Sequence, residues 1–435
     1  MNRYFHSVRL DRDKCRGCTN CIKHCPTEAI RVRGGKAQII AERCIDCGEC
    51  IRVCPYHAKI AYTDPLSDIN RFKYKIALPA PSLYGQFKAL ASVERVLVGL
   101  KLMGFDEVYE VARGADVVSC ALRERLSQKS DLPVISSACP AVVRLIQVRF
   151  PNLIDNIIDL QSPMEVAASA AKSEYAKKMG IKRSDIGAFF ITPCPAKMTA
   201  IKNPYGAAKS EVDGAISVID IYGLLSGQLK KPGVITESGE TASVYGVGWA
   251  NSGGECSASG SGNCLAVDGI SNVIKVLEEI ENMKLTDLEF FEGLACPGGC
   301  VGGPLTFENP FVARTRIRKL AAGIKKGDLD AQYAAKYIAD GTVDFTQPIE
   351  ARPVMKIDED MSVAMKKLEE IEAIAARLPG LDCGSCGSPS CRAMAEDIVR
   401  GDAKELDCIF KLRDKVTSLA EQMVELTGKE RKQNS

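Results

Sequence analysis

Histidine is scarce in this chain, which has only three among 435 residues: His6, His24 and His57. Zinc and non-haem iron sites that need several imidazole ligands are therefore not expected. Long apolar runs are also missing, because no stretch approaches the roughly 20 apolar residues that a membrane-spanning helix needs. The first fifteen residues lack the apolar core of a signal peptide. We therefore expect a cytoplasmic protein without a membrane partner.

An excess of charge of either sign is missing as well. Lysine and arginine number 57, aspartate and glutamate 55, and the net charge is +2. Such a chain has no bulk field that would attract nucleic acid or a membrane surface, so we expect its partners to be recognised locally. With 46% hydrophobic and 26% charged residues, it has the composition of a globular protein, and its length allows two to four domains.

Cysteine, in contrast, is abundant, with 19 residues. In a reducing compartment we do not expect these thiols to pair as disulfides, and their tight, repeated spacing indicates metal ligation. Three cysteines lie outside the spaced groups, Cys120, Cys256 and Cys264, and we expect free thiols there. An extra site formed by Cys256 and Cys264 is the weaker alternative.

Two repeats near the N-terminus, CRGCTNCIKHCP and CIDCGECIRVCP, share the spacing C-x2-C-x2-C-x3-C-P. This spacing is typical of bacterial two-cluster ferredoxins, in which the fourth cysteine of each half ligates the cluster of the other half. Zinc is a poor alternative, because zinc sites pair two C-x2-C knuckles. We therefore assign one 4Fe-4S cluster to Cys15, Cys18, Cys21 and Cys54, and a second to Cys44, Cys47, Cys50 and Cys25.

A third group of four cysteines, with the spacing C-x2-C-x4-C-x16-C, lies near the C-terminus. Four thiolates do not by themselves distinguish zinc from an iron-sulfur cluster. Because other iron-sulfur clusters are predicted in the same chain, a third 4Fe-4S cluster is favoured. Its ligands would be Cys383, Cys386, Cys391 and Cys408.

The segment after Cys408 carries apolar residues at alternating intervals of three and four. This pattern predicts a helix whose apolar seam pairs two subunits, with packing of a single helix on its own domain as the alternative. The seam consists of Ile409, Leu412, Val416, Leu419, Met423 and Leu426.

Between the cysteine groups, short β-like runs alternate with helical segments, which predicts parallel sheets. The expected strands lie in KYKIALPAP, LPVISSA, IGAFFITP and TASVYGVG, and the expected helices include SVERVLVGLKLMG, ISNVIKVLEEIENM and MSVAMKKLEEIEAIAARL. A hairpin is expected in AIRVRGGKAQII, between the two ferredoxin repeats.

Three motifs of the middle part place cysteines beside proline or glycine: SSACP at 136–140, TPCPAK at 192–197 and FFEGLACPGGCVGG at 290–303. Thiolates from three loops can build one buried cubane, and glycine permits close approach of the backbone. Together with the repeats that precede them, these motifs resemble the FeFe-hydrogenase family over about residues 1–345.

The resemblance implies a hydrogen-binding H-cluster, a 4Fe-4S cube joined to a two-iron unit with CO, cyanide and azadithiolate ligands. Its protein ligands would be Cys139, Cys194, Cys296 and Cys300, with Cys300 as the bridge. Lys197 would hydrogen-bond one cyanide, Pro81 and Ser82 would line the site beside the other, and Ser162 matches a proton-relay serine. The implied substrates are H2 and protons, and the implied partner is a ferredoxin or another redox or signalling protein.

This chain departs from the catalytic members of the family at several positions. Ala138 stands where they have a proton-relaying cysteine, and Thr192 and Leu294 replace methionines that flank the two-iron unit, which changes the polarity of the pocket. Of the acidic residues of the proton path only Glu124 lies nearby, and Pro304 stands where the enzymes have more glycine.

These departures resemble the sensory branch of the family, which implies reversible H2 heterolysis with slow turnover. A bidirectional, ferredoxin-linked hydrogenase and a non-catalytic iron-sulfur assembly or electron-carrier protein are the alternatives. The expected fold is a multidomain α/β protein. It comprises a two-cluster ferredoxin domain at 1–65, an H-cluster domain of two α/β lobes at 66–345, and a helical 4Fe-4S domain with a coiled-coil-like helix at 346–435.

Overall fold

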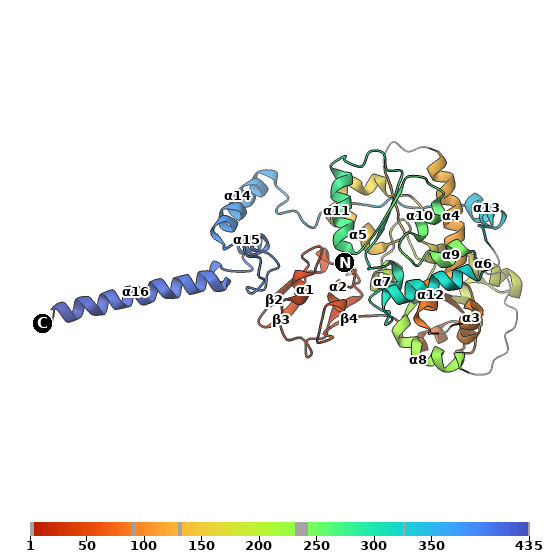
Figure 1. Cartoon of the computed structure of the whole chain (residues 1–435), viewed down its shortest axis with the longest axis horizontal. Helices are drawn as coiled ribbons and strands as arrows, with labels where there is room; N and C mark the ends of the chain where they lie inside the picture. Colours follow the sequence, from red (N-terminus) through yellow and green to blue (C-terminus); the bar gives the residue numbers. More distant parts are fainter. Residues whose placement is uncertain are drawn as a thin grey trace. The chain divides into compact units, whose positions relative to one another are not determined.

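The computed structural model describes residues 4–433 apart from 89, 91, 129–132, 231–241 and 325–326, and apart from the side chains of 427–433. The chain forms two compact units (Figure 1). Unit 1 comprises Met1–Arg9, Ile45–Gly48 and Ala61–Pro353, and unit 2 comprises Leu10–Cys44, Glu49–Ile60 and Val354–Ser435. The chain passes between them within the short strands β1 (Val8–Leu10) and β4 (Lys59–Ala61), and also after Cys44, Gly48 and Pro353. The three-domain division stays a prediction.

The first sheet of unit 1 is parallel, with the strand order β6-β5-β8-β9. Along β5, Ile76 and Leu78 join a core with residues of α4 and α6, whereas Ala77 joins a second core with residues of α3 and α8. Successive strand residues point to opposite faces, so this sheet is buried on both sides, which accounts for its unbroken apolar runs. The strands are β5 (Tyr74–Pro79), β6 (Glu107–Val108), β8 (Ile186–Thr192) and β9 (Gly214–Ser217), and the helices are α3 (Val93–Lys101), α4 (Val111–Ser127), α6 (Pro163–Met179) and α8 (Val218–Leu229).

The second sheet of unit 1 has three parallel strands in the order β10-β11-β7. Helix α11 (Ile270–Glu281) joins β10 to β11 and packs against both. The strands are β7 (Val134–Ile135), β10 (Cys264–Asp268) and β11 (Phe290–Leu294). The two α/β lobes predicted from the sequence are confirmed.

The strand expected in TASVYGVG is wrong. Within its described residues the chain forms helix α9 (Val244–Gly248), and the Ser243 hydroxyl caps it by accepting hydrogen bonds from the N–H groups of Tyr245 (3.1 Å) and Gly246 (3.3 Å). The hydroxyl also donates to the buried carboxylate of Asp116 (2.5 Å). A satisfied serine cap therefore outweighs the β preference of the two valines. Thr241 lies outside the described residues.

The remaining helices of unit 1 are short or connect the two lobes. They are η2 (Leu66–Arg71), η3 (Pro81–Gln86), α5 (Pro140–Arg149), η4 (Pro151–Asn156), η5 (Arg183–Asp185), α7 (Pro195–Lys202), α10 (Gly254–Ser259), η6 (Cys300–Gly302), α12 (Pro310–Ala322) and α13 (Ala331–Ala339).

Unit 2 contains the expected hairpin, with β2 (Ile30–Arg33) antiparallel to β3 (Lys36–Ile39). The third cysteine group packs against this hairpin, since the N–H of Val32 donates to the carbonyl of Gly387 (2.8 Å). Asp397 accepts from Arg31 Nε (2.6 Å) and Arg33 Nη2 (2.7 Å). The other elements are α1 (Asn20–Lys23), η1 (Ala41–Arg43), α2 (Glu49–Arg52), α14 (Met361–Arg377), α15 (Cys391–Val399), η7 (Glu405–Asp407) and α16 (Ile409–Gln433).

Helix α16 confirms the helix predicted after Cys408. Its six seam residues are all exposed, with side-chain exposures from 46% for Leu412 to 68% for Met423. Pairing of two subunits through this seam stays a prediction. Within the part of the chain that the structure describes, no helix is long and apolar enough to cross a membrane.

Candidate functional site

The three cysteine motifs of unit 1 begin where parallel strands end. SSACP follows β7, TPCPAK begins with the last residue of β8, and ACPGGC follows β11. Pro81 and Ser82 follow the neighbouring strand β5. In open parallel sheets, ligands bind beyond the carboxyl ends of the strands, and the order β6-β5-β8-β9 puts the change of direction between β5 and β8. The sheet topology therefore positions these loops around one site.

These loops enclose a cavity of about 80 Å³. Most of the site residues predicted from the sequence line it together: Pro81, Ser82, Ala138, Cys139, Cys194, Lys197, Cys296 and Cys300. Ser162 is buried but does not line the cavity, although Pro163 beside it does.

The four thiols of this cavity are a donor set that fits an iron-sulfur cluster. Burial, with the neighbouring Cys139 adding to the effect, raises the pKa of Cys194 to about 12. Burial likewise raises the pKa of Cys300 to about 12, with Cys139 and Cys296 adding to the effect. Four crowded thiols become thiolates only when a cation compensates them, and the iron of a cluster supplies that charge.

Ser82 provides a second observation that fits the predicted group. Its hydroxyl is fully buried at the cavity wall, and it has no hydrogen-bond partner among the described residues. A buried hydroxyl without a partner is costly, so this one is suited to donate to an acceptor inside the cavity. A cyanide ligand at the predicted place beside Ser82 would be such an acceptor.

Two departures from the catalytic family members now have a structural description. The Thr192 hydroxyl donates to the carbonyl of Cys194 (2.9 Å) and accepts from its N–H (3.0 Å), so it holds the motif loop and does not line the cavity. Leu294 does line the cavity. Of the two replaced positions, only Leu294 is therefore in contact with the cavity, and the change in pocket polarity stays a prediction. Glu124 is exposed on α4.

The sequence reasoning missed a buried acid next to the site. Ser136 donates from Oγ to Glu255 Oε2 (2.6 Å) and accepts from the N–H of Ala138 (3.1 Å), which links the acid to the cavity wall. Burial, with the neighbouring Glu292 adding to the effect, raises the pKa of Glu255 to about 8. Burial also raises the pKa of Glu292 to about 7. Two protonatable carboxyl groups thus lie behind the loop that carries Ala138.

The second ferredoxin repeat reaches this site within unit 1. Cys47 lines the cavity, and Gly48 (φ +76°) approaches so closely that an added Cβ would lie 2.5 Å from the Pro304 ring and 3.0 Å from Pro195. Pro304, whose replacement of glycine had no explanation from the sequence, therefore packs on the loop of the repeat.

Unit 2 brings together the ligands predicted for two of the accessory clusters. Burial, with Cys18, Cys54 and Cys15 adding to the effect, raises the pKa of Cys21 to about 11, so these four thiols are neighbours, as the crossed ferredoxin assignment requires. The third group, Cys383, Cys386, Cys391 and Cys408, lines a small cavity of about 20 Å³.

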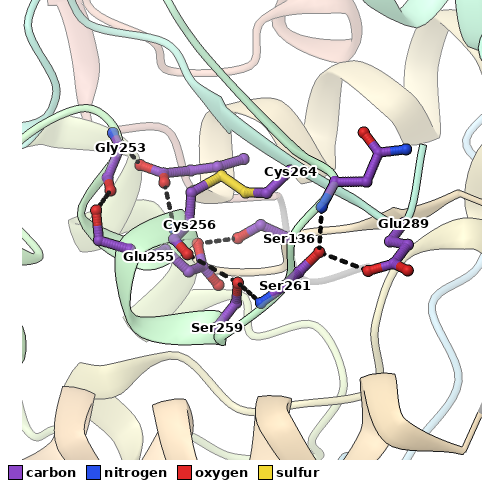
Figure 2. The surroundings of a disulfide bond; sticks show 11 residues. Ser136, Gly253, Glu255, Cys256, Ser259, Ser261, Cys264 and Glu289 are labelled. Atoms are coloured by element: carbon purple, nitrogen blue, oxygen red, sulfur yellow. Dashed lines mark hydrogen bonds between the residues drawn. A yellow bond between two sulfur atoms is a disulfide. The ribbon is translucent and has the colours of Figure 1, made fainter.

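The expectation that the chain has no disulfide is wrong. Cys256 and Cys264 form one, with their Cα atoms 5.9 Å apart (Figure 2), while the other seventeen cysteines form no disulfide. The sequence reasoning treated these two as separate loop thiols, but α10 and the start of β10 bring them together. Cys120 is free, as expected.

Comparisons with known proteins agree with this geometry. A family model described as the iron only hydrogenase large subunit, C-terminal domain, matches residues 73–262 and 255–304. The chain belongs to the iron-only hydrogenase family. A 4Fe-4S dicluster model matches residues 7–55 of this hydrogenase-like protein, and a model described as a putative Fe-S cluster matches 378–410.

Several relatives of this iron-only hydrogenase homologue are known. The large subunit of the periplasmic [Fe] hydrogenase from Nitratidesulfovibrio vulgaris is 27% identical over 392 residues, covering 74% of this chain and 92% of the relative. The cytosolic Fe-S cluster assembly factor NAR1 from Scheffersomyces stipitis is 25% identical over 147 residues, covering 32% and 27%. A variant of [FeFe]-hydrogenase HydA1 from Chlamydomonas reinhardtii shares the fold, with a TM-score of 0.50 at 17% identity over 67% of this chain and 97% of that one.

Proposed function

We propose that this protein is a hydrogen-sensing FeFe-hydrogenase that binds and splits H2 slowly. The observation that supports this proposal is the composition of the cavity wall. Four thiols, Lys197 and the unpartnered Ser82 hydroxyl are retained there, while the relay position carries the methyl group of Ala138. The residues that would bind the H-cluster are therefore kept, while the side chain that would relay protons quickly is missing.

Cys139, Cys194, Cys296 and Cys300 would hold the H-cluster, which supplies the open iron and the bridgehead amine for heterolysis. Lys197 keeps an ammonium group in the cavity wall, where it can offset the charge of anionic ligands. Leu294 and the neighbouring apolar side chains exclude water from the cavity. Ala138 cannot carry a proton, so a proton must leave through other groups or through water.

Three accessory 4Fe-4S clusters complete the proposal, two in the ferredoxin repeats and one between Cys383 and Cys408. They would carry electrons between the cavity and a redox or signalling partner in the cytoplasm. Cys47, which lines the cavity, is the residue of the repeats that would connect this chain of clusters to the site.

The test is maturation of the full chain, followed by infrared spectroscopy, iron analysis and hydrogen oxidation with an artificial acceptor. We expect CO and cyanide bands and roughly 18 irons per chain, from four cubanes and a two-iron unit. Losing a positioned proton-transfer group costs about 10²- to 10⁴-fold in rate, so turnover should fall below that of the fast enzymes by such a factor. Fast turnover would instead support a bidirectional, ferredoxin-linked hydrogenase.

A non-catalytic iron-sulfur assembly or carrier role is the second candidate, and the similarity to the assembly factor NAR1 favours it. It predicts no CO or cyanide bands after maturation and an iron content that stays well below roughly 18 per chain. The unpartnered Ser82 hydroxyl weighs against this role, because a site without diatomic ligands would leave it unsatisfied.

A further inference from the structure

We propose that the Cys256–Cys264 disulfide is a reversible thiol–disulfide switch. It exchanges with a cellular dithiol and controls whether the Glu255 side chain stays buried against Ser136. The proposal does not depend on the proposed hydrogen-sensing function. It rests on where the disulfide lies, on what its half-cystines are joined to, and on the state of the other cysteines.

The disulfide joins two elements that lead directly to the cavity. Cys256 lies in α10, and the segment before this helix contains Trp249 and Ala250, which line the cavity. Cys264 begins β10, which pairs in parallel with β11 so that Asp268 lies opposite Leu294, another cavity residue. The cross-link therefore holds together two parts of the cavity wall at a point away from the cavity itself.

The disulfide is also next to the buried acids (Figure 2). Glu255 precedes Cys256 and accepts the hydrogen bond from Ser136. The N–H of Cys256 donates to Glu292 Oε2 (2.8 Å), and the N–H of Gly253 donates to Glu292 Oε1 (3.0 Å). The charged and titratable groups that act on Glu255 are Glu292 and Lys197.

Of the segment closed by the disulfide, Ala258 and Ser259 are buried, whereas Gly260, Gly262 and Asn263 are exposed and can change conformation without breaking the core. Residues 257–263 read SASGSGN, in which Ser259 Oγ donates to the Cys256 carbonyl (2.8 Å) and Ser261 Oγ donates to Glu289 (2.6 Å). Gly260 ends α10 in the left-handed region, at φ +73°. Small, hydroxyl-rich loops can rearrange at low energetic cost.

Both half-cystines are partly exposed, and a partly exposed disulfide can be attacked by a thiolate. The other seventeen cysteines form no disulfide, and sixteen of them are the predicted cluster ligands. The proposed cytoplasmic setting is one in which dithiols keep thiols reduced. In those surroundings an accessible disulfide meets its reductant continuously.

Thiol–disulfide exchange with the dithiol proceeds in two steps. One thiolate of the dithiol attacks a sulfur of the disulfide, the S–S bond breaks, and a mixed disulfide forms while the other cysteine leaves as a thiolate and takes up a proton. The second thiol of the dithiol then resolves the mixed disulfide. Two electrons pass from the dithiol, which becomes a disulfide, and its two protons end on Cys256 and Cys264.

In the oxidised state the cross-link holds Glu255 against Ser136 in dry surroundings. In the reduced state the link between α10 and β10 is lost, water enters beside Glu255, and the pKa of its carboxyl group falls toward its ordinary range because burial is what raised it. The redox state of Cys256 and Cys264 thus determines whether Glu255, which lies behind the cavity wall, is protonated.

The experiment uses the full-length protein with its clusters, equilibrated in mixtures of reduced and oxidised dithiothreitol. Free thiols are trapped with a maleimide and located by mass spectrometry. We expect the labelled fractions of Cys256 and Cys264 to rise together, from nearly none to nearly all, in one reversible two-electron transition. Cys120→Ser is the matched control and should leave this transition unchanged, whereas Cys256→Ser and Cys264→Ser should each abolish it.

A second readout tests the link to Glu255. Infrared difference spectra between the oxidised and reduced states should contain a protonated-carboxyl band that Glu255→Gln removes. If the pair becomes labelled only in denaturant, the disulfide is structural and the switch is refuted. Full labelling of the protein as isolated under air would also refute it. If Cys256 and Cys264 are reduced reversibly but the carboxyl band is missing, the proposed control of Glu255 by the disulfide is refuted.

Discussion

Lys197 donates a hydrogen bond from Nζ to the backbone carbonyl of Ala138 across 2.9 Å. This bond joins the helix after the second cysteine motif to the loop of the first motif. Because it involves the backbone of Ala138, a change of that side chain leaves the ammonium group in its place. The relay position can therefore be varied without disturbing the cation of the cavity.

Replacing Ala138 with cysteine supplies the missing thiol without moving Lys197. We expect only a modest gain in hydrogen oxidation, because Glu124, the nearby acid of the expected path, is exposed on α4 and cannot take up the proton inside. The measurement is turnover with an artificial acceptor for the wild type and Ala138→Cys. Recovery of nearly the full rate of fast hydrogenases would show that an intact proton path lies behind this position. Ala138→Val, which adds side-chain volume without a group that carries protons, is the matched control.

Replacing Cys300 with serine removes one of the four thiols from the cavity. We expect the CO and cyanide infrared bands to disappear while the electron paramagnetic resonance signals of the ferredoxin repeats survive, since those ligands lie elsewhere. Cys120→Ser, which changes a cysteine outside the motifs, should keep both. Bands that persist in Cys300→Ser would mean that the bridging ligand has been assigned to the wrong cysteine.

The raised pKa of Glu255 makes the stability of the fold depend on pH. The unfolded chain ionises this carboxyl near 4.5, whereas the folded chain keeps the proton up to about 8, so stability falls as the pH rises through this window. Glu255→Gln removes that loss, which is on the order of 1 kcal/mol per pKa unit before relaxation. Urea unfolding at pH 6 and pH 8 should show a smaller decrease for Glu255→Gln than for the wild type. The exposed Glu289→Gln should behave like the wild type.

Asp397 holds the third cysteine group against the ferredoxin hairpin. Its carboxylate accepts from Arg31, Arg33 and the Ser388 hydroxyl, and the side chains of Arg31 and Asp397 are each only 6% exposed. Asp397→Asn leaves a buried guanidinium without its counter-charge, which should cost about 3 kcal/mol. Limited proteolysis should then release a fragment containing residues 378–408 sooner than in the exposed control Asp402→Asn. Equal cleavage rates would contradict the role given to this ion pair.

The seam of α16 should pair two subunits. Leu412 and Leu419 are 46% exposed, and burying such side chains in a helix pair favours association. We expect light scattering to report a dimer for the full chain and a monomer after truncation at Cys408. Leu412→Glu combined with Leu419→Glu should give the same result, while Lys411→Glu, off the seam, should not. An unchanged subunit count in all variants would remove the proposal.

Much of the site could be predicted from the sequence because its cysteines lie at the ends of strands whose apolar runs are themselves recognisable. β5 and β8 are buried on both faces, so their boundaries stand out, and the loops that follow carry Ser82 and Cys194. Spacing alone also placed Cys15, Cys18, Cys21 and Cys54 together.

The rest depended on contacts between distant residues. Ser136 and Glu255 are 119 positions apart, and nothing in either local sequence marks them as partners. The disulfide was missed for another reason, because Cys256 and Cys264 are only eight positions apart but a reducing compartment was expected to keep them as thiols. The strand expected in TASVYGVG failed because the cap by Ser243 depends on its contact with Asp116 in α4, which the local sequence does not reveal.

The close approach of Gly48 to Pro195 and Pro304 bears on how the protein can be divided. A fragment that begins at residue 66 would lack Gly48 and Cys47, and would open one side of the cavity to solvent. Two proline rings would lose their cover at the same time. Exchanging the ferredoxin repeats for those of a relative would succeed only if the incoming loop also has glycine at this point. The N-terminal repeats therefore cannot be removed as an independent part. Shortened versions of this protein should retain residues 45–48.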